Sequence, residues 1–399
     1  MSEPTLGIIT QRLPSGIVQE EKSYFRKLIV AGHKLGLNVF VFTPWDVDME
    51  QERIRAYLYI PDENRWVRKW VPFPELVYDR FRYQPNEQYR RLKWFRSKYS
   101  RLLYLSSPIP GKWAIHQFLS QAASVREHLP AAIRYDRDDD LFEFLRSRRL
   151  VYLKPINGTG GRGIIRLERL AGGRWLVQGR NRKRSIVEPK RVLERQLPER
   201  LADWDAKGKY LIQQGIDSKL PDGRVHDFRL LIQKNGNGEW EITGCAGRVG
   251  PRQSITSNLH GGGKAVPMPE LLRRRFGSND KIESIRKAVY QLGYDVAREI
   301  EGHFGRLCEL GLDIAVDPEG NPWLLEVNPK PAREVFDRIG EKETYAKAIS
   351  RPIEFALWLY KQSIGKVRKQ QNSSRRQLLA AALRRLNMRN RRKLRRLRR

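Results

Sequence analysis

The chain has 399 residues, of which 40% are hydrophobic, and this is enough to build two or three packed units rather than a single core. Its formal charge of +32 points to anionic partners. No stretch approaches the roughly 20 apolar residues of a membrane-spanning helix, and no basic segment precedes a long apolar run at the N-terminus, so we expect a cytoplasmic protein. Its two cysteines, Cys245 and Cys308, lack the spacing of a zinc site and argue against a disulfide framework.

The first hundred residues alternate strand-like and helix-like segments. Apolar runs predict strands at residues 6–10, 39–42 and 76–78, and amphipathic runs predict helices at 24–35 and 89–99. Strands that alternate with helices usually form a parallel sheet. We therefore expect a small α/β domain with a mainly parallel sheet over residues 1–107, which ends before the turn sequence Pro108-Ile109-Pro110-Gly111.

Two further units are expected, at residues 108–208 and 209–362. The second unit has predicted helices from Lys112 onward, at 139–148 and at 189–195, and predicted strands at 151–154 and 164–167. The third begins with a strand at 210–213 and has an antiparallel pair, 228–233 and 240–243, around the turn Asn235-Gly236-Asn237-Gly238. Apolar residues at steps of three and four predict a helix over 281–304 that covers this sheet.

A glycine-rich loop runs from Asn157 to Gly163 between two of these strands. Backbone N–H groups in such a loop can approach phosphate oxygens closely. The Gly-Lys-Ser/Thr ending of a Walker A loop is absent, and the segment after the loop resembles a strand rather than the helix of a Rossmann unit. The loop is therefore a candidate flap over an anion, with Lys112 and Lys154 as fixed positive charges. The alternative is a plain surface hairpin with solvated lysines.

An acidic hairpin is predicted at 307–316 and 322–327, with a turn at 317–321. A two- or four-residue loop centred between Glu319 and Gly320 would pair Asp313 with Glu326, whereas a three- or five-residue loop would shift this register. Asn328 lies on the same face as Glu326 because strand side chains alternate. Opposed carboxylates repel, so the pairing favours a bound cation, and hard oxygen ligands suggest Mg²⁺. Alternatively, both carboxylates point to solvent.

These segments resemble the ATP-grasp superfamily, and the whole chain is similar to its YheC/YheD family of spore-coat-associated proteins. The resemblance covers about residues 108–335 and implies an ATP-grasp fold, in which two α+β subdomains clamp ATP, preceded by the small parallel α/β domain. It rests on Tyr152-Leu153-Lys154-Pro155 with the glycine loop, Asp227-Phe228-Arg229, Ser257-Asn258-Leu259-His260 with Gly261-Gly262-Gly263, Gly311-Leu312-Asp313 and Leu325-Glu326-Val327-Asn328-Pro329.

The resemblance also implies roles for individual residues. The phosphates of ATP would meet Lys112, Lys154 and the loop residues Gly158, Thr159, Gly160, Gly161 and Gly163. The adenine pocket would be lined by Gln213, Gln214 and Ile216, and Mg²⁺ would be held by Asp313, Glu326 and Asn328. The catalytic candidates are Arg229, Arg248 and Asn258, because the arginines would meet the transferred phosphate or a substrate carboxylate. Such enzymes activate a carboxylate as an acyl phosphate, which an amine or thiol then attacks.

The sequence departs from the family pattern at two places. Related amino-acid ligases have Asn-x-x-Arg-Gly-Gly, whereas Gly261 stands at the Arg position here, and we expect Lys264 to replace the missing cation. Gln214 and Gly215 stand where Glu and a large apolar residue are typical. On the residues alone, Arg229 can also be the polar face of a strand, and Asn258 and His260 can be ordinary loop residues.

The C-terminal tail, residues 363–399, is strongly basic and carries no acidic residue. It suits a polyanion, an anionic membrane surface or a spore-coat partner, or it is a solvated tail without a partner. Three functions are thus in competition. The first is an ATP-dependent carboxylate–amine ligase, the second is a coat-associated protein that binds ATP without turnover, and the third is polyanion binding through the tail.

Overall fold

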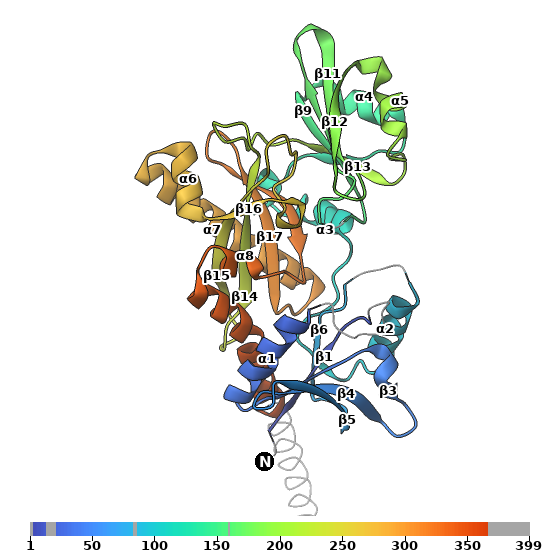
Figure 1. Ribbon diagram of the computed structural model, residues 1–399, viewed down its shortest axis with the longest axis vertical. Helices are drawn as coiled ribbons and strands as arrows, with labels where there is room; N and C mark the ends of the chain where they lie inside the picture. The colour runs from blue at the N-terminus through green and yellow to red at the C-terminus, as the bar shows by residue number, and fades with distance from the viewer. Residues whose placement is uncertain (1–2, 13–20, 83–85, 159, 366–399) are drawn as a thin grey trace, which may run out of the picture.

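The computed structural model describes residues 3–12, 21–82, 86–158 and 160–365. These residues build three sheets that follow one another along the long axis of the molecule, with the N-terminal sheet at one end (Figure 1). None of the helices in this part of the chain is long and apolar enough to cross a membrane. The expected tail, from residue 366 onward, lies outside the described residues. The unit boundaries at 107/108, 208/209 and 362/363 stay predictions.

The N-terminal sheet has seven strands in the order β3-β4-β2-β1-β6-β7, with β5 paired to β4. Its elements are β1 (Thr5–Ile9), α1 (Lys22–Lys34), β2 (Asn38–Phe42), β3 (Val47–Asp48), β4 (Arg53–Ile60), β5 (Arg65–Pro72), β6 (Leu76–Asp79), α2 (Glu87–Lys98) and β7 (Leu103–Tyr104). The neighbours β2, β1, β6 and β7 are parallel, as predicted. The β4–β5 hairpin was not predicted, and because β3, β4 and β5 pair antiparallel, the complete sheet is mixed rather than mainly parallel.

The middle sheet is antiparallel, with six strands in the order β12-β11-β10-β9-β13-β8. Its elements are α3 (Lys112–Leu119), β8 (Ala132–Arg134), α4 (Asp138–Arg146), β9 (Leu150–Pro155), β10 (Ile165–Arg169), β11 (Arg174–Arg180), β12 (Ile186–Leu193), α5 (Leu197–Ala202) and β13 (Tyr210–Gln214).

Two predictions about the middle sheet were wrong. The helix expected at 189–195 is instead β12, because this segment forms a hairpin with β11, whose Trp175 and Val177 enter the core beneath the sheet. The strand expected to open the third unit, β13, pairs with β9 and β8 and so belongs to the middle sheet. Its neighbours in the sheet are about sixty to eighty residues earlier in the chain, and only long-range pairing selects them.

The third sheet is antiparallel and has the order β16-β15-β14-β17-β18. Its elements are β14 (His226–Lys234), β15 (Trp240–Val249), β16 (Lys264–Pro267), α6 (Met268–Phe276), α7 (Asn279–Phe304), β17 (Glu309–Val316), β18 (Pro322–Asn328) and α8 (Glu334–Arg338). Helix α7 buries the apolar face predicted for it, including Ile285, Val289 and Val296, in one core with β14 and β17. The prediction that this helix covers the sheet is confirmed.

The helix over 342–365 joins the N-terminal sheet to the rest of the molecule. Its residues Ile349, Ile353 and Phe355 share a hydrophobic core with Leu6 of β1 and Leu28 of α1. The N-terminal unit is therefore completed by a segment from the far end of the described chain, which holds it against the third sheet.

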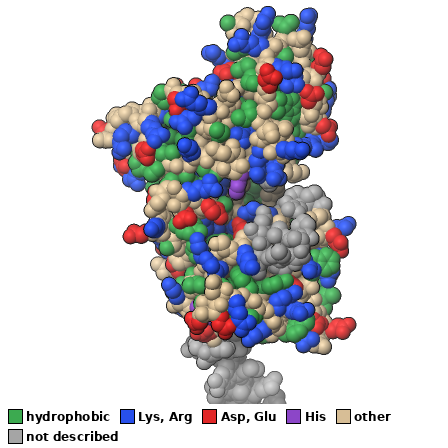
Figure 2. Space-filling view, in the orientation of Figure 1, with side chains coloured by type: hydrophobic (Ala, Val, Ile, Leu, Met, Phe, Trp, Pro, Cys, Tyr) green, Lys and Arg blue, Asp and Glu red, His purple; other side chains and the backbone are tan. Residues whose placement is uncertain are grey.

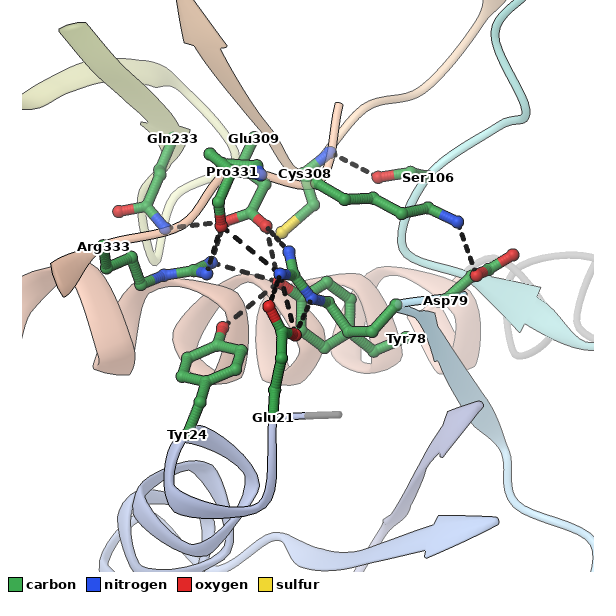
Figure 3. Close-up of polar contacts among 12 residues, drawn as sticks. Glu21, Tyr24, Tyr78, Asp79, Ser106, Gln233, Cys308, Glu309, Pro331 and Arg333 are labelled. Atoms are coloured by element: carbon green, nitrogen blue, oxygen red, sulfur yellow. Dashed lines mark hydrogen bonds and ion pairs between the residues drawn. The ribbon is translucent and has the colours of Figure 1, made fainter. Parts of the chain in front are cut away.

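A buried ionic cluster around Glu309 makes a second junction between these parts (Figure 3). The Glu309 carboxylate at the start of β17 pairs with Arg333 and, at 3.1 Å, with Arg80, which follows β6. Arg80 also binds Glu21 at 2.8 Å, and the Tyr78 hydroxyl donates to Glu309 at 2.6 Å. We call Glu309, Arg80, Arg333, Glu21 and Tyr78 the Glu309 cluster. Each charge in the Glu309 cluster meets an opposite charge, and the cluster therefore fixes the N-terminal sheet beside the third sheet.

Candidate functional site

A cleft of about 1120 Å³ runs between the middle and third sheets and reaches the end of β6 in the N-terminal sheet. This exceeds the usual range of small-molecule pockets, about 300–1,000 Å³, and leaves room for more than one ligand. Lys and Arg side chains are distributed over the face of the molecule that Figure 2 draws, including the junction between its upper and lower parts. A cleft bordered by positive charge favours anionic ligands.

The β17–β18 hairpin places its acidic pair in this cleft, although by a different route from the one predicted. Its loop spans five residues, 317–321, and Val316 pairs with Pro322, which is the shifted register. A β-bulge then leaves Leu325 without a partner between Leu324 and Glu326, and this restores the pairing of Asp313 with Glu326. The predicted pairing is confirmed, whereas the even loop length from which it was inferred is wrong.

Asp313 is held by two arginines from neighbouring strands. Arg229 Nε on β14 lies 2.6 Å from its Oδ1, and Arg248 Nη2 on β15 lies 3.1 Å from its Oδ2. Arg248 also donates two hydrogen bonds, of 2.7 and 2.6 Å, to Asp227. Burial alone would raise the pKa of Asp313, but the guanidiniums of Arg229 and Arg248 outweigh it and lower this pKa to about 2. Asp313 is therefore an anion at any physiological pH.

Glu326 faces the lysine that the sequence placed near the phosphates. Lys112 Nζ, at the start of α3, lies 2.9 Å from Glu326 Oε1 and donates a 2.6 Å hydrogen bond to the carbonyl of Gly158. The repulsion between the opposed carboxylates of Asp313 and Glu326 is thus already offset by side chains of the protein. Repulsion alone does not require a metal ion here.

The donor set nevertheless suits Mg²⁺. Asp313, Glu326 and Asn328 all line the cleft, and together they offer carboxylate and amide oxygens as ligands. Among the described residues no group of three or more His, Cys, Asp or Glu could hold a metal ion. Mg²⁺ takes one or two carboxylates and fills its remaining positions with water and phosphate oxygens, so two carboxylates and an amide beside a phosphate site are a sufficient protein contribution.

Lys154 lies beneath the glycine loop at the end of β9. Its Nζ donates a 2.6 Å hydrogen bond to Gln213 Oε1 on the adjacent strand β13. Burial lowers the pKa of Lys154, and Lys112 lowers it further, while Glu326 and Asp313 oppose this shift. An ammonium group that has lost water and has a second cation nearby gains strongly from an added anion.

Most of the predicted site residues come together in the cleft. Its lining includes Lys112, Lys154, Gly158, Gly160, Gly161, Gln213, Gln214, Ile216, Arg229, Arg248, Asn258, Asp313, Glu326 and Asn328. Gly163 does not line it, because this residue turns the base of the loop at φ +67° and its N–H donates to the Asn181 carbonyl. Lys264 does not line it either, since it is exposed on the edge strand β16. Thr159 lies outside the described residues.

Two residues of the quoted motifs received no role in the site from the sequence: Asp227 orients Arg248, and His260 lines the cleft. Arg184, which lines the cleft on the side of the glycine loop, and Arg180 were not singled out at all. Arg180 lies directly behind Gly261 and donates a 2.9 Å hydrogen bond from Nη2 to its carbonyl. The repeated cations of Arg180-Asn181-Arg182-Lys183-Arg184 were the available signal, but the segment was not recognised as the turn of a hairpin.

The cleft lies between two antiparallel sheets and combines a glycine loop, two lysines and an acidic hairpin. This combination is typical of an ATP-grasp protein. The chain matches the family model described as YheC/D-like ATP-grasp over residues 101–359. It belongs to this family, and the predicted family and ATP-grasp fold class are confirmed.

Two curated relatives come from Bacillus subtilis (strain 168). The chain is 27% identical to the endospore coat-associated protein YheD over 90% of this chain and 80% of the relative. It is 26% identical to the endospore coat-associated protein YheC over 82% of this chain and 89% of the relative. Among solved structures, D-cycloserine synthetase DcsG has 14% identity and a TM-score of 0.49, covering 88% of this chain and 99% of that chain.

Proposed function

We propose that this protein binds ATP with Mg²⁺ and uses it to join a carboxylate to an amine, or to a thiol, through an acyl phosphate. One observation carries the proposal. The Asp313–Glu326 pair lies in the same cleft as Lys112, Lys154 and the glycine loop, so oxygen ligands for a metal and cations for phosphates converge. Metal-bridged phosphates beside fixed cations are the common arrangement for phosphoryl transfer.

Each group has a role in binding. Lys112 and Lys154 hold the phosphates, and Lys112 exchanges its contacts with Glu326 and Gly158 for phosphate oxygens when the nucleotide enters. Gln213, Gln214 and Ile216 receive the adenine. Asp313, Glu326 and Asn328 hold Mg²⁺, which when bound neutralises negative charge on the phosphates.

The chemical step transfers the terminal phosphoryl group of ATP to a carboxylate oxygen of the substrate and releases ADP. The amine then attacks the acyl carbon, inorganic phosphate leaves with the bonding electron pair, and the proton of the amine passes to solvent. Arg229 and Arg248 are fixed by Asp313 and Asp227 beside this position, so their orientation needs little reorganisation as charge develops on the transferring group. Asn258, which lines the cleft beside Gly161 of the glycine loop, holds a substrate oxygen by a hydrogen bond.

Turnover is tested by ADP release. The full chain is incubated with Mg-ATP and pools of amino acids or peptides, and we expect at least one pool to raise ADP release above the rate with ATP alone. Absence of any increase across broad pools, from a protein that binds Mg-ATP in calorimetry, would contradict the ligase.

A second candidate is a coat-associated protein that binds ATP without turnover. It is favoured by the names of the two Bacillus relatives and by the fact that Asp313 and Glu326 already have protein cations as partners. On this proposal the protein resides at the spore coat, and ATP binding stabilises the clasped form of the cleft. It predicts calorimetric ATP binding and a higher melting temperature with ATP, with no ADP formed.

A further inference from the structure

The turn between β11 and β12 brings two arginines to the far side of the glycine loop. Arg184 Nε donates a 3.0 Å hydrogen bond to the carbonyl of Gly160, and Arg180 Nη2 donates one of 2.9 Å to the carbonyl of Gly261. The same turn carries Arg182 and Lys183, both exposed. The hairpin thus connects the glycine loop of the middle unit with the 258–261 loop of the third unit.

Neither Arg180 nor Arg184 has a carboxylate partner within the part of the chain that the structure describes. Arg180 is only 3% exposed, and its Nε is buried without a hydrogen-bond partner. Burial lowers the pKa of Arg180 and the nearby Arg184 lowers it further, while burial and Arg162 lower the pKa of Arg184. Carbonyl groups satisfy part of each guanidinium, but two neighbouring cations without a carboxylate favour the approach of an anion.

Glycines make room for both guanidiniums. A Cβ atom on Gly261 would overlap Arg180 Nη1, and one on Gly160 would lie 2.7 Å from Arg184 Nη2. Arg180 therefore occupies the space into which a side chain at position 261 would point. The side chain that meets position 261 is thus a cation of the β11–β12 hairpin rather than Lys264, and of the two hairpin arginines Arg184 lines the cleft.

This positive pair is separate from the cations assigned to the nucleotide. Lys112 contacts the opposite end of the glycine loop, at Gly158, and Arg229 and Arg248 are paired with Asp313 and Asp227. Asn258 and His260 line the cleft next to Arg184. Burial lowers the pKa of His260, and Arg184, Arg82 and Arg338 lower it further against the opposing charge of Glu334, so cations outnumber carboxylates around this side chain.

We infer that Arg180 and Arg184 bind an anionic oxygen group of the co-substrate, which is a carboxylate compound with a second anionic group, as in an acidic peptide. This rests on the proposed function, because it assumes that the nucleotide occupies the Lys112 end of the cleft. The reacting carboxylate of the co-substrate then lies toward Arg229. Its second anionic group neutralises Arg180 and Arg184 and so holds the glycine loop and the 258–261 loop together.

The test measures binding of a tri-glutamate peptide to the full chain loaded with Mg-ADP, by calorimetry at fixed ionic strength. Tri-glutamine is the neutral control ligand. Arg180→Gln and Arg184→Gln should each weaken tri-glutamate binding about tenfold or more. Arg180→Lys keeps the charge and should lose less than Arg180→Gln. Arg182→Gln, an exposed arginine in the same turn, should bind as the wild type does.

A parallel titration with Mg-ATP separates this inference from the proposed function. All variants should bind Mg-ATP within about twofold of the wild type, and a wild-type protein that does not bind Mg-ATP would refute the proposed function itself. The inference is overturned if the ADP-loaded wild type does not prefer tri-glutamate to tri-glutamine, or if all variants bind tri-glutamate equally. It is also overturned if Arg180→Gln and Arg184→Gln weaken Mg-ATP binding but not tri-glutamate binding, because the nucleotide would then be the anion.

Discussion

The molecule contains two arginine pairs with opposite surroundings. In the Glu309 cluster, Arg80 and Arg333 share the Glu309 carboxylate, and Glu21 and the Tyr78 hydroxyl complete the set. At the β11–β12 hairpin, Arg180 and Arg184 donate to backbone carbonyls and have no carboxylate among the described residues. Arg80, Arg333 and Arg180 are similarly buried and Arg184 is half-buried, so exposure does not distinguish Arg180 from the arginines of the Glu309 cluster.

The two pairs differ in the anion that neutralises each of them. A buried cation whose anion is another side chain belongs to the fold, whereas a cation at a cleft without such an anion, such as Arg184, is placed for a ligand. Asp313 lies between these cases, because its arginines make it stable without a ligand although it lines the cleft. The comparison predicts that removing one charge affects stability in the first pair and binding in the second.

The largest expected effect is on stability in the Glu309 cluster. Glu309→Gln leaves the charges of Arg80 and Arg333 without their shared anion and should lower the free energy of unfolding by about 3–5 kcal/mol. Urea unfolding measures this loss of stability. Glu241→Gln is the control, because Glu241 also pairs with two cations, Lys347 and Arg351, but its side chain is 32% exposed. That control should cost about 1 kcal/mol or less. Equal losses in the two variants would contradict the structural role of the cluster.

A smaller effect is expected at Gly261. In Gly261→Ala the added methyl group displaces Arg180, which should cost about 1–3 kcal/mol of stability and also weaken tri-glutamate binding. Gly302→Ala is the matched substitution, because Gly302 faces open space within α7. There alanine should raise the free energy of unfolding by about 0.5–1 kcal/mol. A Gly261→Ala protein as stable as the wild type, with unchanged tri-glutamate binding, would show that Arg180 is not fixed at this position.

The smallest expected effect is the stability change of Arg180→Gln in the absence of ligand. Glutamine removes an unpaired buried charge and can keep the hydrogen bond to the Gly261 carbonyl, so the free energy of unfolding should change by less than about 1 kcal/mol. Urea unfolding beside Glu309→Gln compares the two pairs directly. A loss as large as that of Glu309→Gln would place Arg180 among the structural residues.

The acidic hairpin shows how far local sequence reasoning reaches. Asp317-Pro318-Glu319-Gly320-Asn321 marked the turn, and strand alternation placed Asn328 with Glu326. The bulge at Leu325 could not be predicted, because a single extra residue in a strand has no distinct sequence signal. Its shift cancelled that of the five-residue loop, so the pairing of Asp313 with Glu326 was correct despite an incorrect loop length.

Contacts between segments that are distant in the chain could not be predicted from the sequence. The pairing of β13 with β9, the contact of Arg180 with Gly261 and the sharing of Glu309 by Arg80 and Arg333 all join segments that no local pattern connects. Lys264 was chosen as the replacement cation because it is near Gly261 in sequence. The structure instead brings Arg180 there from the middle sheet, and sequence distance is a poor guide where two sheets close on one cleft.

The most direct test of the account is the Mg²⁺ dependence of ATP binding in the wild type, Asp313→Asn and Glu326→Gln. Calorimetric titrations with ATP are made in Mg²⁺ and in a chelator. We predict that Mg²⁺ tightens ATP binding to the wild type by about tenfold or more and that both variants lose this gain. Unchanged Mg²⁺-dependent affinity in both variants would show that the hairpin is not the metal site.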